Sequence, residues 1–174
     1  MSTIKIRSYE PLDRSVVLQA LIDLQNFEVP LHDTRLPGET TMEAYLDRML
    51  CALEKGDGRI FVAELDGEFV GFVGCLVVED DVVQETADSN RYGYIKDIFV
   101  ADRHRGGGIA QQLLTTAEQY LARTGVTRLR INVLANNLKA RRAYERYGFE
   151  QYEILYEKRV RQGNPSPREG RGAS

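Results

Sequence analysis

A run of glycines between an apolar segment and a helical one offers a place to hold an anion. The segment from Arg105 to Ala110 reads Arg-Gly-Gly-Gly-Ile-Ala. Glycines allow main-chain angles that bring successive N–H groups onto one concave surface, and they carry no side chain that would keep a ligand away. The helix that follows adds unpaired N–H groups and the positive end of its dipole. Phosphate oxygens are the ligand that this turn favours, with Arg105 as a charged donor at its edge.

Two well-known nucleotide-binding motifs fit this turn poorly. A P-loop requires lysine and then serine or threonine after its last glycine, where this chain has Ile109 and Ala110. A dinucleotide fingerprint requires glycine or alanine at Gln111, and it follows the first strand of a domain instead of a late one. The P-loop is therefore excluded, and a Rossmann-type oxidoreductase that binds NADH is a distant alternative.

Two motifs together resemble those of the GCN5-related N-acetyltransferase (GNAT) superfamily. The first follows an apolar strand and precedes an amphipathic helix. The second lies at the expected distance downstream, between the fifth strand and the end of the fourth helix, and the resemblance covers about residues 4–158. The motifs are Arg105-x-x-Gly108-x-Ala110 and Asn137-x-x-Ala140-x-x-x-Tyr144-x-x-x-Gly148-Phe149.

The resemblance implies that acetyl-CoA is the cofactor. Its pyrophosphate would rest on the main-chain N–H groups of the glycine turn, which suits both the glycines and the helix start. Its pantetheine arm would run beside the preceding strand like an added strand, and Asn137 would bond that arm from the other side. The cofactor-binding residues expected on this basis are Ile98, Phe99, Val100, Arg105, Gly106, Gly107, Gly108, Ile109, Ala110, Asn137, Ala140 and Tyr144.

The resemblance also implies direct transfer of the acetyl group to a primary amine of a small molecule or peptide, without a covalent enzyme intermediate. An amine must lose a proton before it attacks, and Asp97 is the expected base, joined by Glu79 or Asp80. Tyr144 is the expected acid that protonates the departing thiolate. Structural alternatives stand beside both roles, because Asp97 could pair with Lys96 or Arg105 at a strand end, and Tyr144 could simply pack on the apolar stripe of its helix. A non-catalytic acyl-CoA-binding or regulatory module is the alternative function.

Composition favours one compact domain and argues against some partners. The chain has 174 residues, of which 43% are hydrophobic, and a net charge of −3. This mildly acidic balance argues against nucleic acid as the main partner and suits a cationic small molecule or peptide. Cys51 and Cys75 have no metal-ligand spacing and are expected to be buried free thiols, so no metal site is expected. We find no signal peptide, membrane span or lipidation motif, and expect a cytoplasmic protein without a membrane partner.

The first half of the chain predicts a strand, two helices and a hairpin. Apolar residues at helical spacing follow Asp13 and Thr40, and Thr40 is the expected N-cap of the second helix. Between these helices, residues 28–39 have no periodicity and are expected to form a substrate lid. The expected strands are residues 4–7, 59–65 and 68–78, and Asp66-Gly67 is the expected hairpin turn.

The second half predicts strands that alternate with helices, which gives an α/β fold. The mixed central sheet is expected to be antiparallel in its N-terminal half, with a parallel pair at the cofactor cleft and about four flanking helices. Residues 1–159 are assigned to this single domain and residues 160–174 to a disordered tail. The resemblance suggests a possible homodimer through the C-terminal strands. The expected strands are 92–100 and 128–134, a last strand or hairpin is expected over 149–158, and the expected helices are 109–124 and 138–147.

Overall fold

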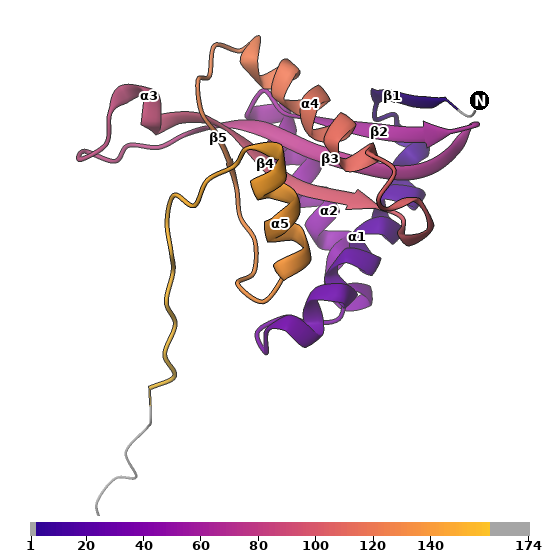
Figure 1. Ribbon diagram of the computed structural model, residues 1–174, viewed down its shortest axis with the longest axis horizontal. Helices are drawn as coiled ribbons and strands as arrows, with labels where there is room; N and C mark the ends of the chain where they lie inside the picture. Colours follow the sequence, from indigo (N-terminus) through magenta and orange to yellow (C-terminus); the bar gives the residue numbers. More distant parts are fainter. Residues whose placement is uncertain (1–2, 161–174) are drawn as a thin grey trace, which may run out of the picture.

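The computed structural model describes residues 3–160, which form a five-stranded sheet covered by helices on both faces (Figure 1). The strands lie in the order β1-β2-β3-β4-β5, and each pairs with its neighbour in antiparallel fashion except β5, which runs parallel to β4. This arrangement confirms the mixed α/β sheet with a parallel pair after an antiparallel half. The strands are β1 (Ile4–Ser8), β2 (Arg59–Leu65), β3 (Glu68–Glu79), β4 (Arg91–Val100) and β5 (Leu129–Ile131).

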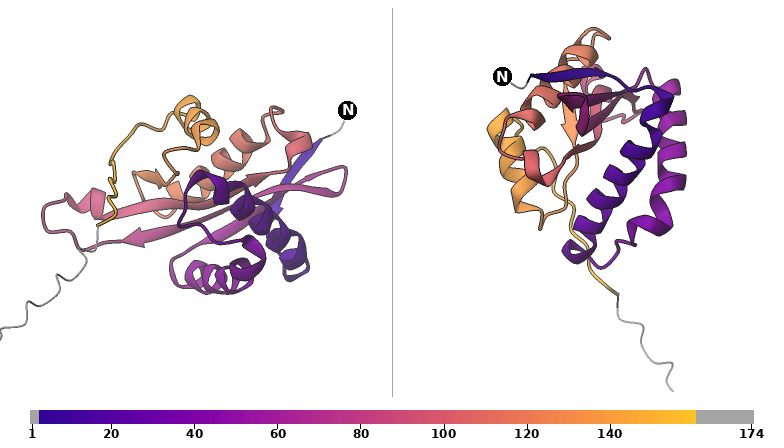
Figure 2. Two further views of the ribbon diagram at one scale, coloured as in Figure 1. Left: turned by 90° about the horizontal axis from the view of Figure 1, so that it is seen from below. Right: turned by 90° about the vertical axis from the view of Figure 1, so that its right-hand side faces the viewer.

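The long helices are divided between the two faces of the sheet. The first two lie side by side on one face, and the fourth and fifth lie on the other side (Figure 2). About four helices were expected, and the additional one is a single turn before β4. The helices are α1 (Arg14–Glu28), α2 (Gly38–Lys55), α3 (Ala87–Asn90), α4 (Ile109–Ala122) and α5 (Leu138–Tyr147), with 3₁₀ turns η1 (Pro11–Asp13), η2 (Val29–Leu31) and η3 (Asp102–His104).

Alternation along the strands separates the core into two layers. Ile60, Val62 and Phe72 point toward α1 and α2, where Leu46 of α2 is fully buried. Their strand neighbours point toward α4, where Leu113 is fully buried. Burial of one such leucine stabilises the fold by about 1.5–3 kcal/mol, so both faces of the sheet are held firmly beneath the site.

The β2–β3 hairpin has the expected turn. Asp66 and Gly67 both have positive φ angles, 52° and 84°, as a two-residue turn between right-twisted strands requires. Leu65 pairs with Glu68 directly beside the turn. The local sequence signal is therefore confirmed.

A β-bulge in β4 changes the face on which the next side chains lie. Asp97 pairs with Gly74 and Ile95 pairs with Cys75, so Lys96 between them is the extra residue. Ile95 belongs to the core layer beneath α4, whereas Phe99 belongs to the layer beneath α1 and α2. Asp97 shares the face of Phe99 because successive side chains of a strand alternate. Without the bulge it would share the face of Ile95.

Three local expectations prove wrong. The second helix begins at Gly38 and not after Thr40, because Asn26 Oδ1 accepts a 2.8 Å hydrogen bond from the Gly38 N–H group and extends the first turn. The expected strand 128–134 is reduced to Leu129–Ile131. Cys75 is buried as expected, but Cys51 is exposed.

The expected last strand, residues 149–158, is also absent from the described chain. Phe149 packs against the core beneath α4, and residues 150–160 then run as an extended, exposed segment that we call the C-terminal arm. The side chains of Leu155 and Tyr156 are 92% and 88% exposed. This segment pairs with no strand of the described chain. The tail was predicted for residues 160–174, and all of it after Val160 lies outside the described residues. The boundary between the domain and the tail therefore stays a prediction.

Candidate active site

The glycine turn connects β4 to α4 and leaves its main-chain N–H groups free. Gly106 and Gly108 have φ angles of 84° and 79°, in the left-handed region that favours glycine. Gly108 is the N-cap of α4 and carries no side-chain cap. Within residues 3–160, the N–H groups of Gly106, Gly107 and Gly108 donate no hydrogen bond. The turn therefore has the open donors that a phosphate group requires.

The Arg105 side chain folds back toward the end of β4, onto the residues that precede the glycine turn. Its Nε donates a 3.0 Å hydrogen bond to the carbonyl oxygen of Val100, and one terminal nitrogen lies 2.7 Å from Asp102 Oδ1. The side chain thus closes the short segment that contains η3 at the end of β4. Arg105 directly precedes the free N–H groups in the sequence and adds a positive charge at the start of the glycine turn.

The edge of β4 that faces β5 is open over half its length. β5 pairs with β4 at only three positions, from Gly93 with Leu129 to Ile95 with Ile131. From Lys96 to Val100, β4 continues without a partner on that side. An extended chain that contains amide groups could pair with this free edge as a strand does. Ile98, Phe99 and Val100, which were expected beside the pantetheine arm, lie on this free stretch.

Asn137 is the N-cap residue of α5. It is only 8% exposed, and its Oδ1 accepts a 3.1 Å hydrogen bond from the N–H group of Ala140. No side-chain nitrogen or oxygen in the described chain is both buried and unpaired, so the amide nitrogen of Asn137 remains accessible. Asn137 therefore caps its helix with one atom and keeps a donor for a ligand with the other.

Asp97 is a largely buried carboxylate that accepts a hydrogen bond from α2. The hydroxyl group of Tyr45 donates to Asp97 Oδ2 at 2.7 Å. Burial raises the pKa of Asp97 to about 6, against the lowering effects of the Tyr45 hydrogen bond and the Lys96 charge. Arg105 does not pair with Asp97, because its contacts are with Val100 and Asp102. Lys96 acts on Asp97 only as a nearby charge.

Tyr144 of α5 lies in the electric field of the same carboxylate. Burial, together with the charges of Glu28 and Asp97, raises the pKa of Tyr144 to about 12. The ring packs edge to face against Phe149, with centroids 6.1 Å apart. In the described chain the hydroxyl group has no hydrogen-bond partner and is not buried. Tyr144 is thus packed through its ring and free at its oxygen, so the two readings of this residue are compatible.

Tyr147, one turn further along α5, has a different environment. Its hydroxyl group donates to Glu118 and lies 3.3 Å from Thr115 Oγ1, both on α4. Its ring stacks on Phe149. These contacts fasten α5 to α4, and they make Tyr147 a structural residue.

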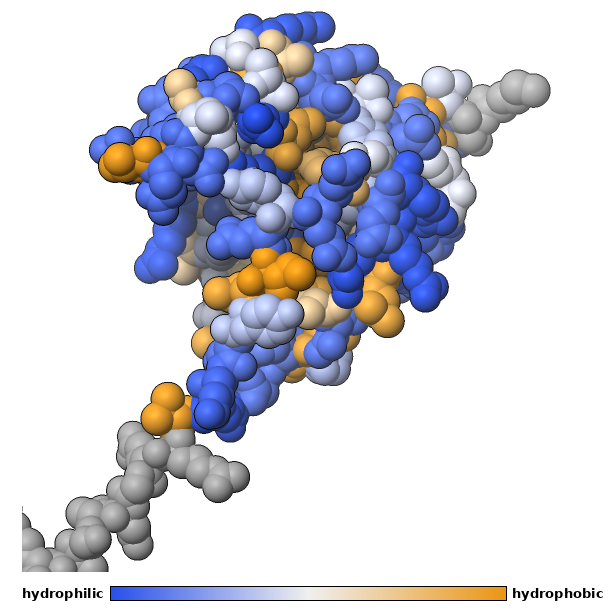
Figure 3. Space-filling view, turned by 60° about the vertical axis from the view of Figure 1, so that its left-hand side comes forward, coloured by the Kyte–Doolittle hydropathy of each residue, from blue (hydrophilic) through white to orange (hydrophobic). Residues whose placement is uncertain are grey.

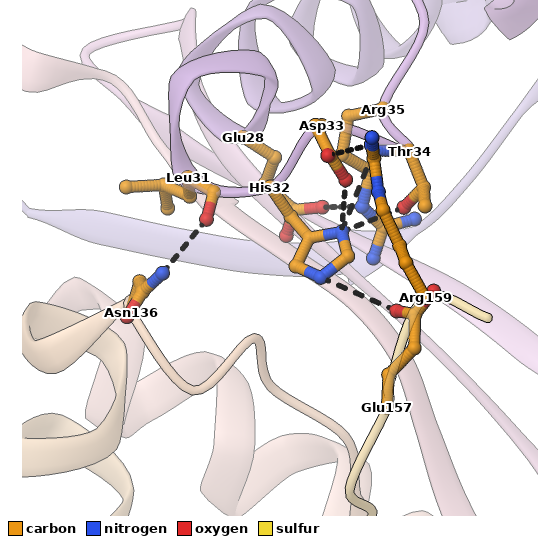
Figure 4. Close-up of polar contacts among 9 residues, drawn as sticks. All are labelled: Glu28, Leu31, His32, Asp33, Thr34, Arg35, Asn136, Glu157 and Arg159. Atoms are coloured by element: carbon orange, nitrogen blue, oxygen red, sulfur yellow. Dashed lines mark hydrogen bonds and ion pairs between the residues drawn. The ribbon is translucent and has the colours of Figure 1, made fainter. Parts of the chain in front are cut away.

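The segment between α1 and α2, which was expected to be a substrate lid, borders this site and is held at several points. Glu28 lies 3.2 Å from Arg35, and Leu31 O accepts a 2.9 Å hydrogen bond from Asn136 (Figure 4). The C-terminal arm reaches the same segment, where Glu157 Oε2 lies 3.5 Å from His32 Nε2 and Arg159 pairs with Asp33. Burial raises the pKa of Glu28, although the charge of Arg35 opposes this.

Glu79 and Asp80, expected as partners of Asp97, lie at the opposite end of the sheet. Glu79 pairs with Arg91, five residues along β3 from the Gly74–Asp97 pair. At roughly 3.4 Å per residue this is about 17 Å. Glu79 binds Arg91 and Asp80 accepts from Tyr92, so neither carboxylate contributes to the site.

Tyr45 is the site residue that the sequence pattern did not assign. It lies on the buried stripe of α2 between Met42 and Leu46, where it has the spacing of a core residue. The signal that could have found it is chemical: a phenol oxygen on a buried stripe requires a hydrogen-bond partner.

Other hollows lie outside this cleft. A groove of about 460 Å³ runs between β1 and α4 and borders the glycine turn only at Gly108. The groove is lined by Ile4, Ile6, Gly108, Gln111, Gln112, Thr115 and Thr116.

On the face shown in Figure 3, hydrophilic side chains surround hydrophobic ones, some of them recessed. In the part of the chain that the structure describes, no helix is long and apolar enough to cross a bilayer, and no group of three or more potential ligands could hold a metal ion.

Comparison with known proteins gives a family match over most of the chain. The model of the acetyltransferase (GNAT) family matches residues 19–149. An uncharacterized N-acetyltransferase of Bacillus subtilis, YhfO, is 31% identical over 99 residues, which are 57% of this chain and 63% of that relative. Two further curated relatives are matched over 43% and 44% of their length, so the chain spans less than two thirds of these relatives.

Two aminoglycoside acetyltransferases are also similar to the chain. Aminoglycoside N(6′)-acetyltransferase type 1 of Salmonella typhimurium is 28% identical over 57% of this chain and 68% of its own length. The structure of AAC(6′)-Iy in complex with a bisubstrate analogue of coenzyme A and acetylneamine superposes with a TM-score of 0.66. The two sequences are 22% identical, and the superposition covers 92% of this chain and 100% of the AAC(6′)-Iy chain. At this identity the superposition shows the shared fold.

Proposed function

The chain belongs to the GNAT family of acetyltransferases, and from this premise we propose that it transfers an acetyl group from acetyl-CoA directly to a primary amine of a small molecule or peptide. The observation that carries the proposal is the pair Asp97 and Tyr144. One is a largely buried carboxylate on the unpaired stretch of β4, and the other is a phenol whose ring is packed and whose hydroxyl group is accessible. The charge of Asp97 acts on Tyr144. A base and an acid at one cleft meet the two proton-transfer needs of the reaction.

The residues at the cleft fit the parts of acetyl-CoA. Its pyrophosphate is assigned to the N–H groups of Gly106–Ala110 with the charge of Arg105, and its amide-containing arm to the free edge Ile98–Val100. The amide nitrogen of Asn137, at the start of α5, would donate to that arm, while its oxygen caps the helix at Ala140. When bound, the cofactor supplies a thioester whose C–S bond breaks as the C–N bond of the product forms.

Asp97 removes one proton from the ammonium group of the acceptor. A lysine-like amine has a pKa near 10.4, so its deprotonation costs about 4.6 kcal/mol at pH 7. A carboxylate with a pKa of about 6 is a stronger base than an exposed aspartate and is still mainly ionised at pH 7. Main-chain N–H groups on the free edge of β4 can stabilise the oxyanion that forms at the acetyl carbonyl.

Tyr144 gives its proton to the leaving sulfur atom. Burial keeps the phenol protonated at neutral pH, which is the state an acid requires. It recovers a proton from the nitrogen of the new amide, and the proton on Asp97 passes to solvent. The overall reaction therefore releases one proton, and neither side chain forms a bond to the acetyl group.

We assign the acceptor to small-molecule cationic amines ahead of peptides. The charge of Glu28 reaches Asp97, Tyr45 and Tyr144, so the acceptor side of the cleft favours a positive group. The relatives named as aminoglycoside acetyltransferases support this class.

We also propose that the protein is a homodimer. The C-terminal arm exposes Ile154, Leu155 and Tyr156 to solvent, and within residues 3–160 the outer edge of β5 has no strand partner. An apolar segment with strand propensity and an open sheet edge are complementary, and a second copy offers both.

The proposed function is tested with the purified chain, acetyl-CoA and a panel of polyamines, aminoglycosides and amino-terminal peptides. Products are measured by mass spectrometry, because the exposed Cys51 would react with a thiol reagent. Saturating acetyl-CoA should raise the melting temperature by roughly 5–11 °C, and at least one small amine should gain a single acetyl group. Cofactor binding without transfer to any amine would favour a non-catalytic acyl-CoA-binding module. Stabilisation by NADH alone would overturn the proposal.

A further inference from the structure

Tyr45 is a polar residue on an otherwise apolar face of α2, and its hydroxyl group contacts Asp97, the proposed base. Met42, Leu46 and Met49 on the same stripe of α2 are buried against the sheet. The Tyr45 ring follows them, but its hydroxyl group extends to β4 and donates 2.7 Å to Asp97 Oδ2. Residues 52 positions apart are thus joined by one short hydrogen bond.

We propose that Tyr45 is a positioning residue for Asp97: it holds Oδ2 and so directs Oδ1 toward the amine of the acceptor. The proposal rests on the proposed function, because Asp97 is the base in that reaction. Oδ1 accepts no hydrogen bond within residues 3–160, and the absence of buried, unpaired polar side-chain atoms means that it is accessible. One oxygen of the carboxylate is therefore fixed and the other is free to take a proton.

Tyr45 can act only as a donor in this pair. Burial raises the pKa of the Tyr45 phenol far above its usual range, and the charge of Asp97 raises it further. The phenol therefore stays protonated wherever Asp97 titrates. A hydrogen bond to the charged carboxylate favours that form, so Tyr45 counteracts the effect of burial and keeps the base ionised at neutral pH.

The position of Tyr45 is itself fixed from the strand side. The Nζ of Lys96 lies 5.1 Å from the centroid of the Tyr45 ring, on its face. Lys96 is the extra residue of the β-bulge. The bulge places the Asp97 side chain on the face of the sheet that α2 covers, and Lys96 contacts the ring of Tyr45, whose hydroxyl group binds Asp97. Both features direct the carboxylate toward α2.

The charged and titratable groups around Asp97 come from every element that packs there. Lys96 lowers the pKa of Asp97, whereas the charge of Glu28 raises it. In turn, the charge of Asp97 raises the pKa of Tyr94 and of Tyr144. Tyr45 is the group among them that donates a hydrogen bond to the carboxylate, so its removal has a predictable sign.

The test compares Tyr45→Phe with Tyr120→Phe. Tyr120 also donates one hydrogen bond, to Asp57 O, but it lies on α4 outside the cleft and serves as the matched control. In kcat/KM measured from pH 5 to pH 9, Tyr45→Phe should move the acid-side limb upward by about one unit, because an ionised acceptor loses its donor. At pH 7 the rate should fall by roughly two-fold, and at pH 5.5 by roughly eight-fold. Tyr120→Phe should leave the limb in place.

A merely structural role for Tyr45 predicts a different result. Loss of packing or of folded protein would lower kcat at every pH and leave the limb where it is, which would overturn the proposal. In the Asp97→Asn background, Tyr45→Phe should have no further effect on kcat, because the two residues act as one unit. An additional loss in the double variant would also contradict the proposal.

A second readout separates this proposal from the proposed function. The carboxyl carbon of Asp97, assigned by its loss in Asp97→Asn, is titrated by carbon NMR in the wild type and in Tyr45→Phe. A higher pKa in the variant supports the positioning contact even if the wild type acetylates no amine, which would reject the proposed function alone. Equal titration curves in an active enzyme would reject the role of Tyr45 and leave the function standing.

Discussion

The guanidinium group of Arg105 donates a 3.0 Å hydrogen bond to the carbonyl oxygen of Val100, and so joins the first residue of the glycine turn to the last residue of β4. This contact closes the short segment that contains η3, between the end of β4 and the glycine turn. It holds the residue that directly precedes Gly106, so the glycine turn begins from a fixed point. Arg105 thus fixes the start of the glycine turn as well as carrying a positive charge there.

Substitution of Arg105 should therefore weaken cofactor binding. We expect Arg105→Ala to raise the dissociation constant for coenzyme A by roughly ten-fold, since both the closure and one positive charge are lost. Titration calorimetry measures this. Asp102→Asn is the control, because it removes only the ion pair and leaves the Val100 contact. An unchanged affinity in Arg105→Ala would exclude Arg105 from the cofactor site.

The glycines of the turn should differ in their tolerance of alanine. Gly108 has a φ angle of 79°, where a side chain costs about 1–2 kcal/mol. A methyl group on Gly107 would have its nearest contact at 3.5 Å, which is ordinary packing. Gly108→Ala should lower the free energy of unfolding by about 1 kcal/mol and weaken coenzyme A binding, while Gly107→Ala should retain stability. Urea unfolding of both variants decides this, and equal losses would contradict the assignment.

The hydroxyl group of Tyr144 should be needed for turnover and dispensable for cofactor binding. Tyr144→Phe keeps the ring that packs on Phe149 and removes only the proton donor. We expect kcat to fall by roughly ten- to a thousand-fold with cofactor affinity unchanged. Tyr147→Phe, which loses its contacts with Glu118 and Thr115, should change stability and leave kcat near the wild-type value. Wild-type turnover in Tyr144→Phe would remove it from the mechanism.

Asp97 should cost the protein stability above pH 6. Its pKa is about 6 in the folded state and about 3.9 in an unfolded chain, so folding favours the protonated form. Its contribution is fully present below about pH 4 and is lost as the pH rises through 6. Asp97→Asn should therefore raise the free energy of unfolding at pH 8 by up to about 3 kcal/mol, with a higher melting temperature, and should differ little from wild type at pH 3.5. An Asp97→Asn variant that is less stable than wild type at pH 8 would contradict the predicted loss of stability. Full activity of that variant would contradict the role of Asp97 as the base.

The exposed apolar residues of the C-terminal arm should control the oligomeric state. Light scattering of the wild type should give about twice the chain mass of 19.7 kDa, and the double variant Ile154→Lys and Tyr156→Lys should give the monomer mass. Val83→Lys is the control, because Val83 is also exposed but lies on the loop between β3 and α3. A monomeric wild type would refute the proposed dimer.

The sequence predicts the elements that have local boundary signals. Asp66-Gly67 defines a hairpin through the angles that its turn requires, and α5 lies between the cap Asn137 and the C-terminal glycine Gly148 exactly as its spacing indicates. The glycine turn is recognisable for the same reason. In each case the interactions that determine the structure lie within a few residues of one another.

The features that the sequence does not predict depend on distant contacts. The hydrogen bond between Tyr45 and Asp97 joins an apolar helix stripe to a bulged strand, and neither pattern reveals the other. Residues 149–158 have strand-like composition, but a strand also requires a partner, and β5 ends at Ile131. Short-range patterns therefore predict the glycine turn as an anion site. The environment of the Asp97 carboxylate depends on contacts between residues that are distant in the sequence.

The gap between β4 and β5 makes the sheet weakest where three residue pairs join its last strand to the rest. Separation of β5 and α5 from the remaining sheet requires less free energy than global unfolding, because it breaks few pairs. A ligand that bridges the gap opposes this local opening in proportion to its concentration. Proteases that cleave the opened chain would then remove the protein faster when the ligand is scarce, so its cellular lifetime would follow the supply of the ligand.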